Sequence, residues 1–209
     1  MDATYFVTVL VTLFAIINPV GNVAIFEAVT SCFDATTKRT VAKRAIIFSA
    51  AVLLAFGIFG DIIFRIFGIT LPGFRVMGGI LLFYLGFNLV EGQGTTHKVS
   101  EECTQEEAIS VAIVPLTIPL YAGPGSIAVT MVLVSQSTGP VDLLLTLGAV
   151  LIILGLSYVL IVNSEAVFKR LGKNGSIAFT RIMGVLLAGM GTTFVISGII
   201  DAVKQAGLG

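Results

Sequence analysis

The sequence predicts an all-α integral membrane protein with six transmembrane helices. Hydrophobic residues make up 56% of the chain and charged residues only 11%, whereas a soluble domain carries about 25% charged residues. Mean hydropathy is +1.03. Apolar stretches of roughly 20 residues, the length that crosses a bilayer, recur along the chain and lack the alternating pattern of a membrane β-barrel. Because the links between them are short, we expect residues 1–209 to form a single transmembrane domain.

The six apolar stretches define the expected spans in chain order. They lie near 5–29, 45–67, 71–89, 108–135, 143–162 and 177–200. The residues before the first stretch lack the positive region and cleavage motif of a signal peptide, so we expect that stretch to be retained as a spanning helix. The longest link is an acidic loop at residues 93–107.

Two short signatures recur at nearly the same offset. Arg75-Val76-Met77-Gly78 returns as Arg181-Ile182-Met183-Gly184 after 106 positions, and Pro19 and Pro124 are 105 positions apart. We therefore expect two three-helix repeats, residues 1–92 and 108–209, joined by the loop at 93–107. Because each copy has three spans, the second enters the membrane from the opposite side, so the repeats are inverted.

The basic residues favour one orientation in the membrane. Lys and Arg occur in the first, third and fifth links: Lys38, Arg39, Lys43, Arg44, Lys98, Lys169, Arg170 and Lys173. The fourth link, residues 136–142, has none. By the positive-inside rule the odd-numbered links, including the acidic loop, are cytoplasmic. We expect a multi-pass protein of the inner (cytoplasmic) membrane with both termini outside.

The first span contains a helix-breaking cluster at residues 18–22. Pro19 lacks an N–H group and interrupts the helical ladder. Asn18, which precedes it, is expected to be extended, and Gly21 allows close approach of a ligand. Asn22 is expected to cap the restarted half-helix through its side-chain oxygen.

The fourth span contains a second cluster: Ala122, Gly123, Pro124, Gly125 and Ser126. Unwound backbone inside the membrane is tolerated only when it is buried in protein or lines a wet cavity. Two broken spans at equivalent positions of inverted repeats are typical of secondary transporters, whose substrate site lies near the bilayer midplane. The alternative is that these prolines and glycines only kink the helices and improve their packing.

The chemistry of such breaks suits a small zwitterion. The start of a half-helix presents free N–H groups and partial positive charge to a carboxylate, and unwound carbonyls suit an ammonium group or a small cation. The small residues leave little room for a long substrate side chain. The expected substrate-binding residues are Asn18, Pro19, Gly21, Asn22, Ala122, Gly123, Pro124, Gly125 and Ser126.

Other polar residues have weaker functional interpretations. Asp61 and Glu27 lie towards span ends, where they bind a coupling ion or proton or simply face the lipid headgroups. No enzyme is expected: His97, the only histidine, falls in the acidic loop, and Ser126 has no evident base nearby. The sequence also has no zinc motif, and we expect no metal or other cofactor.

At these motifs the chain resembles the MarC family of bacterial and archaeal inner-membrane proteins, which includes the SnatA-type small neutral amino acid transporter. Residues 18–22, 73–83, 119–127 and 181–187 carry the resemblance, which covers essentially the whole chain. It implies a six-helix membrane protein that transports small neutral amino acids such as alanine or glycine. It also implies that the two Pro-Gly clusters hold the substrate.

Together these patterns predict a secondary transporter that moves a small neutral amino acid across the inner membrane by alternating access. Coupling to Na+ or H+ and assembly as a homodimer are left open, and nucleic acid is not an expected partner. The alternatives are a passive channel for a small solute and a structural or regulatory membrane protein without transport activity.

Overall fold

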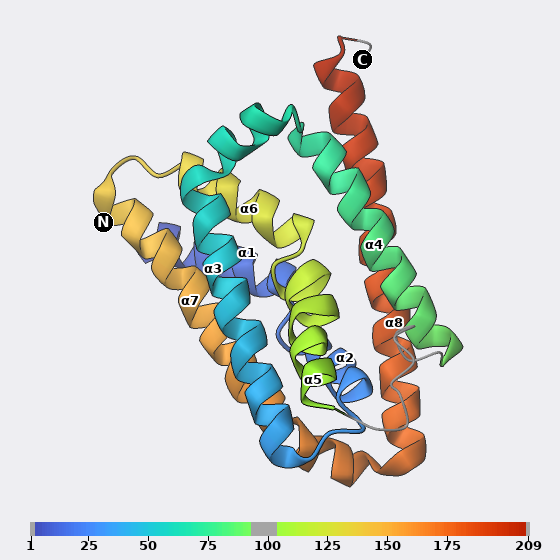
Figure 1. Ribbon diagram of the computed structural model, residues 1–209. Helices are drawn as coiled ribbons and strands as arrows, with labels where there is room; N and C mark the ends of the chain where they lie inside the picture. The colour runs from blue at the N-terminus through green and yellow to red at the C-terminus, as the bar shows by residue number, and fades with distance from the viewer. Residues whose placement is uncertain (1–2, 93–103, 208–209) are drawn as a thin grey trace.

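The computed structural model describes residues 3–92 and 104–207, and every regular element in these ranges is a helix (Figure 1). In chain order the elements are α1 (Ala3–Ile17), α2 (Gly21–Val29), α3 (Ala35–Phe67), α4 (Leu71–Glu91), α5 (Gln105–Val111), the π-helical stretch η1 (Ala112–Tyr121), α6 (Pro124–Ser135), α7 (Pro140–Val162) and α8 (Ser164–Gln205). Most of the expected acidic loop, residues 93–103 with His97, Lys98 and Cys103, lies outside the described residues. The last residues of that loop belong to α5.

Among the described residues, five helical segments are long and apolar enough to cross a membrane, and there are six if a bent pair counts as one span. The five are Tyr5–Val29, Ala35–Phe67, Leu71–Glu91, Pro140–Val162 and Ile177–Gln205. The bent pair joins Ala108–Tyr121 to Pro124–Ser135 at an angle of 54°. The prediction of an all-helical membrane protein is therefore confirmed.

Helix α3 begins ten residues before the apolar run from which its span was predicted. Asp34 caps this start, because its carboxylate accepts hydrogen bonds from the N–H groups of Thr36 (3.3 Å) and Thr37 (3.2 Å). Hydrogen bonds from Thr37, and then from Thr36, lower the pKa of Asp34. The capped extension is polar and basic, so hydropathy alone did not mark it as helix.

The start of α1 and the end of α8 lie towards the same end of the bundle as the end of α3, although Figure 1 shows the two chain ends well apart, at the left and the upper right. A hydrogen bond of 3.0 Å between the hydroxyls of Tyr5 and Thr146 places the start of α1 beside the start of α7. An ion pair of 2.6 Å between Arg75 and Asp201 places the start of α4 beside the end of α8. The turns before α3 and before α8 meet at the opposite end, where Glu27 binds both Lys38 and Ser164.

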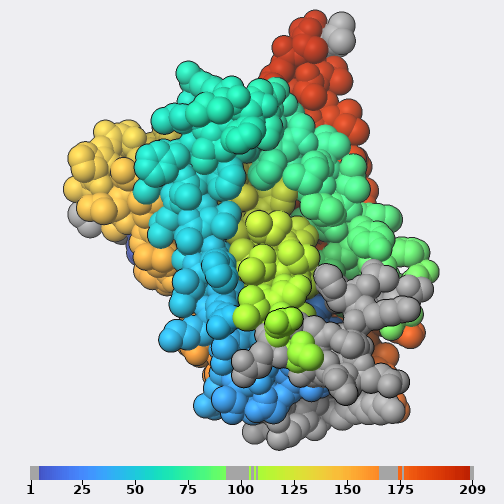
Figure 2. Space-filling view, viewed as in Figure 1, coloured from blue at the N-terminus to red at the C-terminus, as the bar shows by residue number. Residues whose placement is uncertain are grey.

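The broken segments occupy the centre of the molecule. The Tyr5–Val29 span is 56% buried, whereas the spans of α3 and α8 are each 22% buried. Figure 2 shows α3 and α4 on the outer surface with α5 between them. The second break is therefore enclosed by protein, and the first is partly enclosed, with Pro19 buried and Val20 53% exposed.

Helix α4 lies alongside the C-terminal half of α8 (Figure 1), and glycines allow their backbones to touch. A Cβ atom built on Gly86 would lie 2.5 Å from the backbone nitrogen of Ala188, and one on Gly191 would lie 2.5 Å from that of Phe83. Small residues at such contacts permit the close packing on which helix association in membranes depends. By contrast, Gly189 of α8 faces open space.

Candidate functional site

The first break lies between Ile17, where α1 ends, and Gly21, where α2 begins. Asn18 has φ +50°, in the left-handed region, so the expectation of an extended Asn18 was wrong. Asparagine tolerates this region better than most residues. The N–H of Asn18 still donates to the carbonyl of Phe14 (3.0 Å). The chain therefore leaves the helix at Asn18 itself, before the proline.

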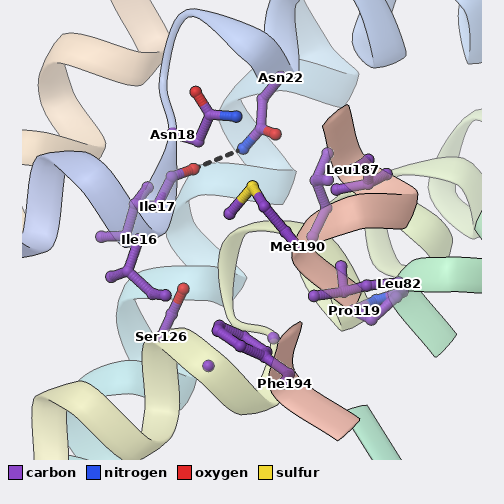
Figure 3. A pocket seen from close by; sticks show the side chains of 13 residues that line it. Ile16, Ile17, Asn18, Asn22, Leu82, Pro119, Ser126, Leu187, Met190 and Phe194 are labelled. Carbon is purple, nitrogen blue, oxygen red and sulfur yellow. Dashed lines mark hydrogen bonds between the residues drawn. The ribbon is translucent and has the colours of Figure 1, made fainter. Parts of the chain in front are cut away.

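The two asparagines of this break have capping roles that differ from the prediction. The Asn18 side-chain oxygen accepts the N–H of Gly21 (3.2 Å) and so caps the start of α2. The Asn22 amide nitrogen donates to the carbonyl of Ile17 (2.8 Å) and so caps the end of α1 (Figure 3). Asn22, which was expected to cap α2, is 2% exposed. Between them the two amides satisfy backbone groups on both sides of the break.

The second break lies between η1 and α6. Gly123 is extended (φ −74°, ψ 167°), and Pro124 follows as the first residue of α6. A Cβ atom on Gly123 would lie 1.9 Å from the carbonyl oxygen of Pro119, so the chain can turn here only with glycine. Gly125 and Ser126 are the second and third residues of α6, positions whose N–H groups have no acceptor within their own α-helix. The start of α6 thus presents two donors towards the break.

Both breaks line a single small cavity of about 20 Å³, room for about one water molecule (Figure 3). The first break and the end of α1 contribute Ile16, Ile17, Asn18 and Asn22; the second break and η1 contribute Pro119, Leu120, Gly123, Gly125 and Ser126; α4 and α8 contribute Leu82, Leu187, Met190 and Phe194. Polar groups come from the breaks and apolar groups mainly from the surrounding helices. The cavity therefore combines hydrogen-bonding groups at one part of its wall with an apolar surface at another.

Five of the nine residues expected to bind substrate line this cavity: Asn18, Asn22, Gly123, Gly125 and Ser126. The other four support them. Gly21 packs against the side chain of Asn18, and the ring of Pro124 packs where a Cβ of Gly78 would be. Pro19 and Ala122 are buried beside the breaks.

The cavity residues on α4 and α8 were not predicted. Phe194 packs over the second break, and a Cβ atom on Gly125 would lie 2.0 Å from its ring. Leu82, Leu187 and Met190 complete the apolar wall (Figure 3). These side chains occur in ordinary apolar stretches, so no local signal distinguishes them from residues that face lipid.

The two carboxylates considered for ion coupling lie away from the cavity. Asp61 is exposed and pairs with Arg65 on the next turn of α3 (2.8 Å). The side chain of Glu27 is 10% exposed and is bound by Lys38 (2.6 Å) and by the hydroxyl of Ser164. Neither carboxylate is a lining residue.

Comparisons with known proteins agree with the resemblance noted in the sequence. Residues 3–203 match the family described as MarC family integral membrane protein. A UPF0056 membrane protein of Methanocaldococcus jannaschii is 36% identical over 97% of this chain and 99% of its own length. A UPF0056 membrane protein of Bacillus subtilis is 34% identical over 90% of each chain.

The UPF0056 inner membrane protein MarC of Citrobacter koseri is 30% identical over 93% of this chain and 94% of its own length. No solved structure matches the chain significantly. The family match and the relatives both cover nearly the full length. The chain therefore belongs to the MarC family of integral, multi-pass membrane proteins.

Proposed function

We propose that this protein is a secondary transporter that carries a small neutral amino acid across the inner membrane by alternating access. The observation that carries the proposal is the single cavity that both helix breaks line. A buried cavity at two broken spans is where secondary transporters of several folds bind substrate.

The cavity offers a distinct group to each part of such a substrate. The N–H groups of Gly125 and Ser126, in the first turn and at the positive end of α6, bind the carboxylate. The side chains of Asn18 and Ser126 bind the ammonium group or an intervening water. The rings and methyl groups of α4 and α8 enclose the short aliphatic side chain.

The proposal includes two inverted repeats, residues 1–92 and 108–209. The arrangement of the chain supports this. The start of α1 and the end of α8 lie towards one end of the bundle, and α4 packs along the C-terminal half of α8, its counterpart in the second repeat. In this mechanism the two halves rock about the cavity and open it to each side in turn.

The binding step is tested by thermal unfolding of the purified protein with glycine, alanine, serine, leucine and phenylalanine. A ligand that binds only the folded state raises the unfolding temperature. We expect shifts with the three small amino acids and little or none with leucine or phenylalanine. The absence of a shift with every small amino acid would overturn the proposed substrate class.

The transport step is tested by uptake into proteoliposomes with the variant Gly125→Leu, whose side chain fills the cavity. Uptake is expected to be lost while the protein remains folded. Gly155→Leu on α7 is the matched control, because no atom lies within 4 Å of the position of its Cβ. A folded Gly125→Leu protein with normal uptake would exclude this cavity as the substrate site.

Coupling is tested in the same vesicles by imposing Na+ or H+ gradients separately. We propose that one of these gradients drives uptake, with Asp61 and Glu27 as the carboxylates to neutralise first. Uptake that responds to neither gradient would remove active coupling. Flux that does not saturate and shows no counterflow would favour a passive channel instead.

A further inference from the structure

A second concave surface lies far from the breaks, between the first turns of α3 and the end of α7. We call it the basic groove. Its cations are Arg39, Lys43 and Arg44 on α3, and its floor includes Ile47 of α3 and Tyr158 of α7. The volume of the groove is about 630 Å³. None of these residues lines the cavity at the breaks.

The three cations of the basic groove are close together and available. Their positions, i, i+4 and i+5, put them on neighbouring faces of one helical turn, and all three are exposed. Among the described residues, none of them has a carboxylate partner within ion-pair distance. Lys38, in contrast, is neutralised by Glu27. The groove therefore carries three positive charges that no described side chain balances.

The position of the basic groove along α3 places it at the edge of the part of the helix that faces lipid. The apolar part of α3 begins at Ala45, directly after Arg44. Ile47 and Phe48, in the next turn, are 54% and 43% exposed. At a rise of about 1.5 Å per residue, the cations stand at the headgroup level, just above apolar side chains that face lipid tails.

We propose that the basic groove binds an anionic phospholipid. The guanidinium groups of Arg39 and Arg44 and the ammonium group of Lys43 hold the headgroup phosphate, and one acyl chain lies along Ile47 and Tyr158. Arginine guanidinium groups match phosphate oxygens through paired N–H donors. A free phosphate would use the cations alone, whereas the groove continues from the cations onto an apolar floor, and this favours a lipid.

Native mass spectrometry and thermal unfolding of the full-length protein in detergent test this proposal. Phosphatidylglycerol is expected to remain bound and to raise the unfolding temperature, and phosphatidylcholine with the same acyl chains is not. Each cation changed to glutamine is expected to weaken phosphatidylglycerol binding about fivefold. The triple variant Arg39→Gln, Lys43→Gln, Arg44→Gln is expected to lose the thermal shift.

Arg65→Gln is the matched control, because Arg65 is an exposed cation at the other end of α3. Inorganic phosphate and glycerol phosphate, at the same concentration, are expected to give no shift. An equal shift with either of them, or an unchanged phosphatidylglycerol shift in the triple variant, would overturn the proposal. If the triple variant does not fold, the three single variants provide the same comparison through their lipid affinities.

Discussion

At the scale of single residues, the contact between Gly125 and Phe194 sets the size of the cavity. A Cβ atom on Gly125 would lie 2.0 Å from the Phe194 ring, so Gly125→Ala forces the ring to move and reduces the space for substrate. Overpacking of this kind costs about 1–3 kcal/mol in the free energy of unfolding. We expect weaker amino acid uptake in Gly125→Ala and recovery of uptake in Gly125→Ala with Phe194→Ala.

The variant Phe194→Ala alone gives the complementary prediction. Removing the ring enlarges the apolar side of the cavity, so leucine and valine are expected to compete with alanine for uptake. Competition assays in proteoliposomes measure this change in selectivity. If the substrate range of Phe194→Ala is unchanged, Phe194 does not limit the size of the substrate.

Asn22 stabilises the first break through one buried hydrogen bond. Its amide donates to the Ile17 carbonyl at 2.8 Å and is 2% exposed. Asn22→Ala leaves that carbonyl without its partner, and we expect a loss of about 1–3 kcal/mol in the free energy of unfolding. Asn163 is the matched control, because its amide donates to the Val159 carbonyl at 2.7 Å in an exposed position. An equally large loss in Asn163→Ala, measured by detergent-titrated unfolding, would contradict the role given to burial.

At the scale of helices, the α4–α8 contact depends on glycines that face backbone. A Cβ atom on Gly86 would lie 2.5 Å from the carbonyl oxygen of Gly184, which cannot move aside as a side chain can. We expect Gly86→Ala to lower the free energy of unfolding by about 1–3 kcal/mol. Gly189→Ala, in open space on the same pair of helices, is expected to be neutral or stabilising by up to about 1 kcal/mol. Similar losses in both variants would show that close packing against backbone does not decide the effect.

The sequence predicted the helices better than the details of their breaks. Apolar runs located every span, because burial in lipid requires them whatever the neighbouring helices do. The prolines located both breaks, but the capping roles of Asn18 and Asn22 depend on the left-handed turn at Asn18, which the sequence did not reveal. Phe194 was missed because only the packing of α8 against α6 brings it to the cavity.

At the scale of the whole molecule, Glu27 joins three segments at one end of the bundle. Its side chain on α2 pairs with Lys38 of α3 and accepts from Ser164 at the start of α8. With side chains only 10% and 15% exposed, Glu27 and Lys38 form a largely buried pair. Lys38→Met leaves the carboxylate unpaired and is expected to cost about 3–5 kcal/mol, most of which Glu27→Gln in the same protein restores. Additive losses in the double variant would indicate that the two charges do not interact.

The number of membrane crossings depends on whether the bent pair, Ala108–Tyr121 and Pro124–Ser135, runs from one end of the bundle to the other. Helix α3 starts at the Glu27 end, where it carries Lys38, and finishes at the opposite end, where Gly68 follows it. Helix α4 then runs back towards the Glu27 end. The turn after α6 lies beside the turn after α3, because Ser135 and Gly68 line one groove. The bent pair therefore finishes at the end opposite Glu27, and we expect it to cross the membrane as the sixth span.

This arrangement gives a prediction about the two termini. With six crossings they lie on the same side of the membrane, and the positive-inside rule places that side outside. Alkaline phosphatase fused after Gly209 is expected to be active in cells, and green fluorescent protein at the same point is expected to be dark. Fusions after Gly92 serve as the control and are expected to give the reverse, because α4 ends on the cytoplasmic side. A split reporter at the N-terminus completes the test. If it places the termini on opposite sides, the bent pair turns back within the membrane and the two halves are not inverted copies of three spans each.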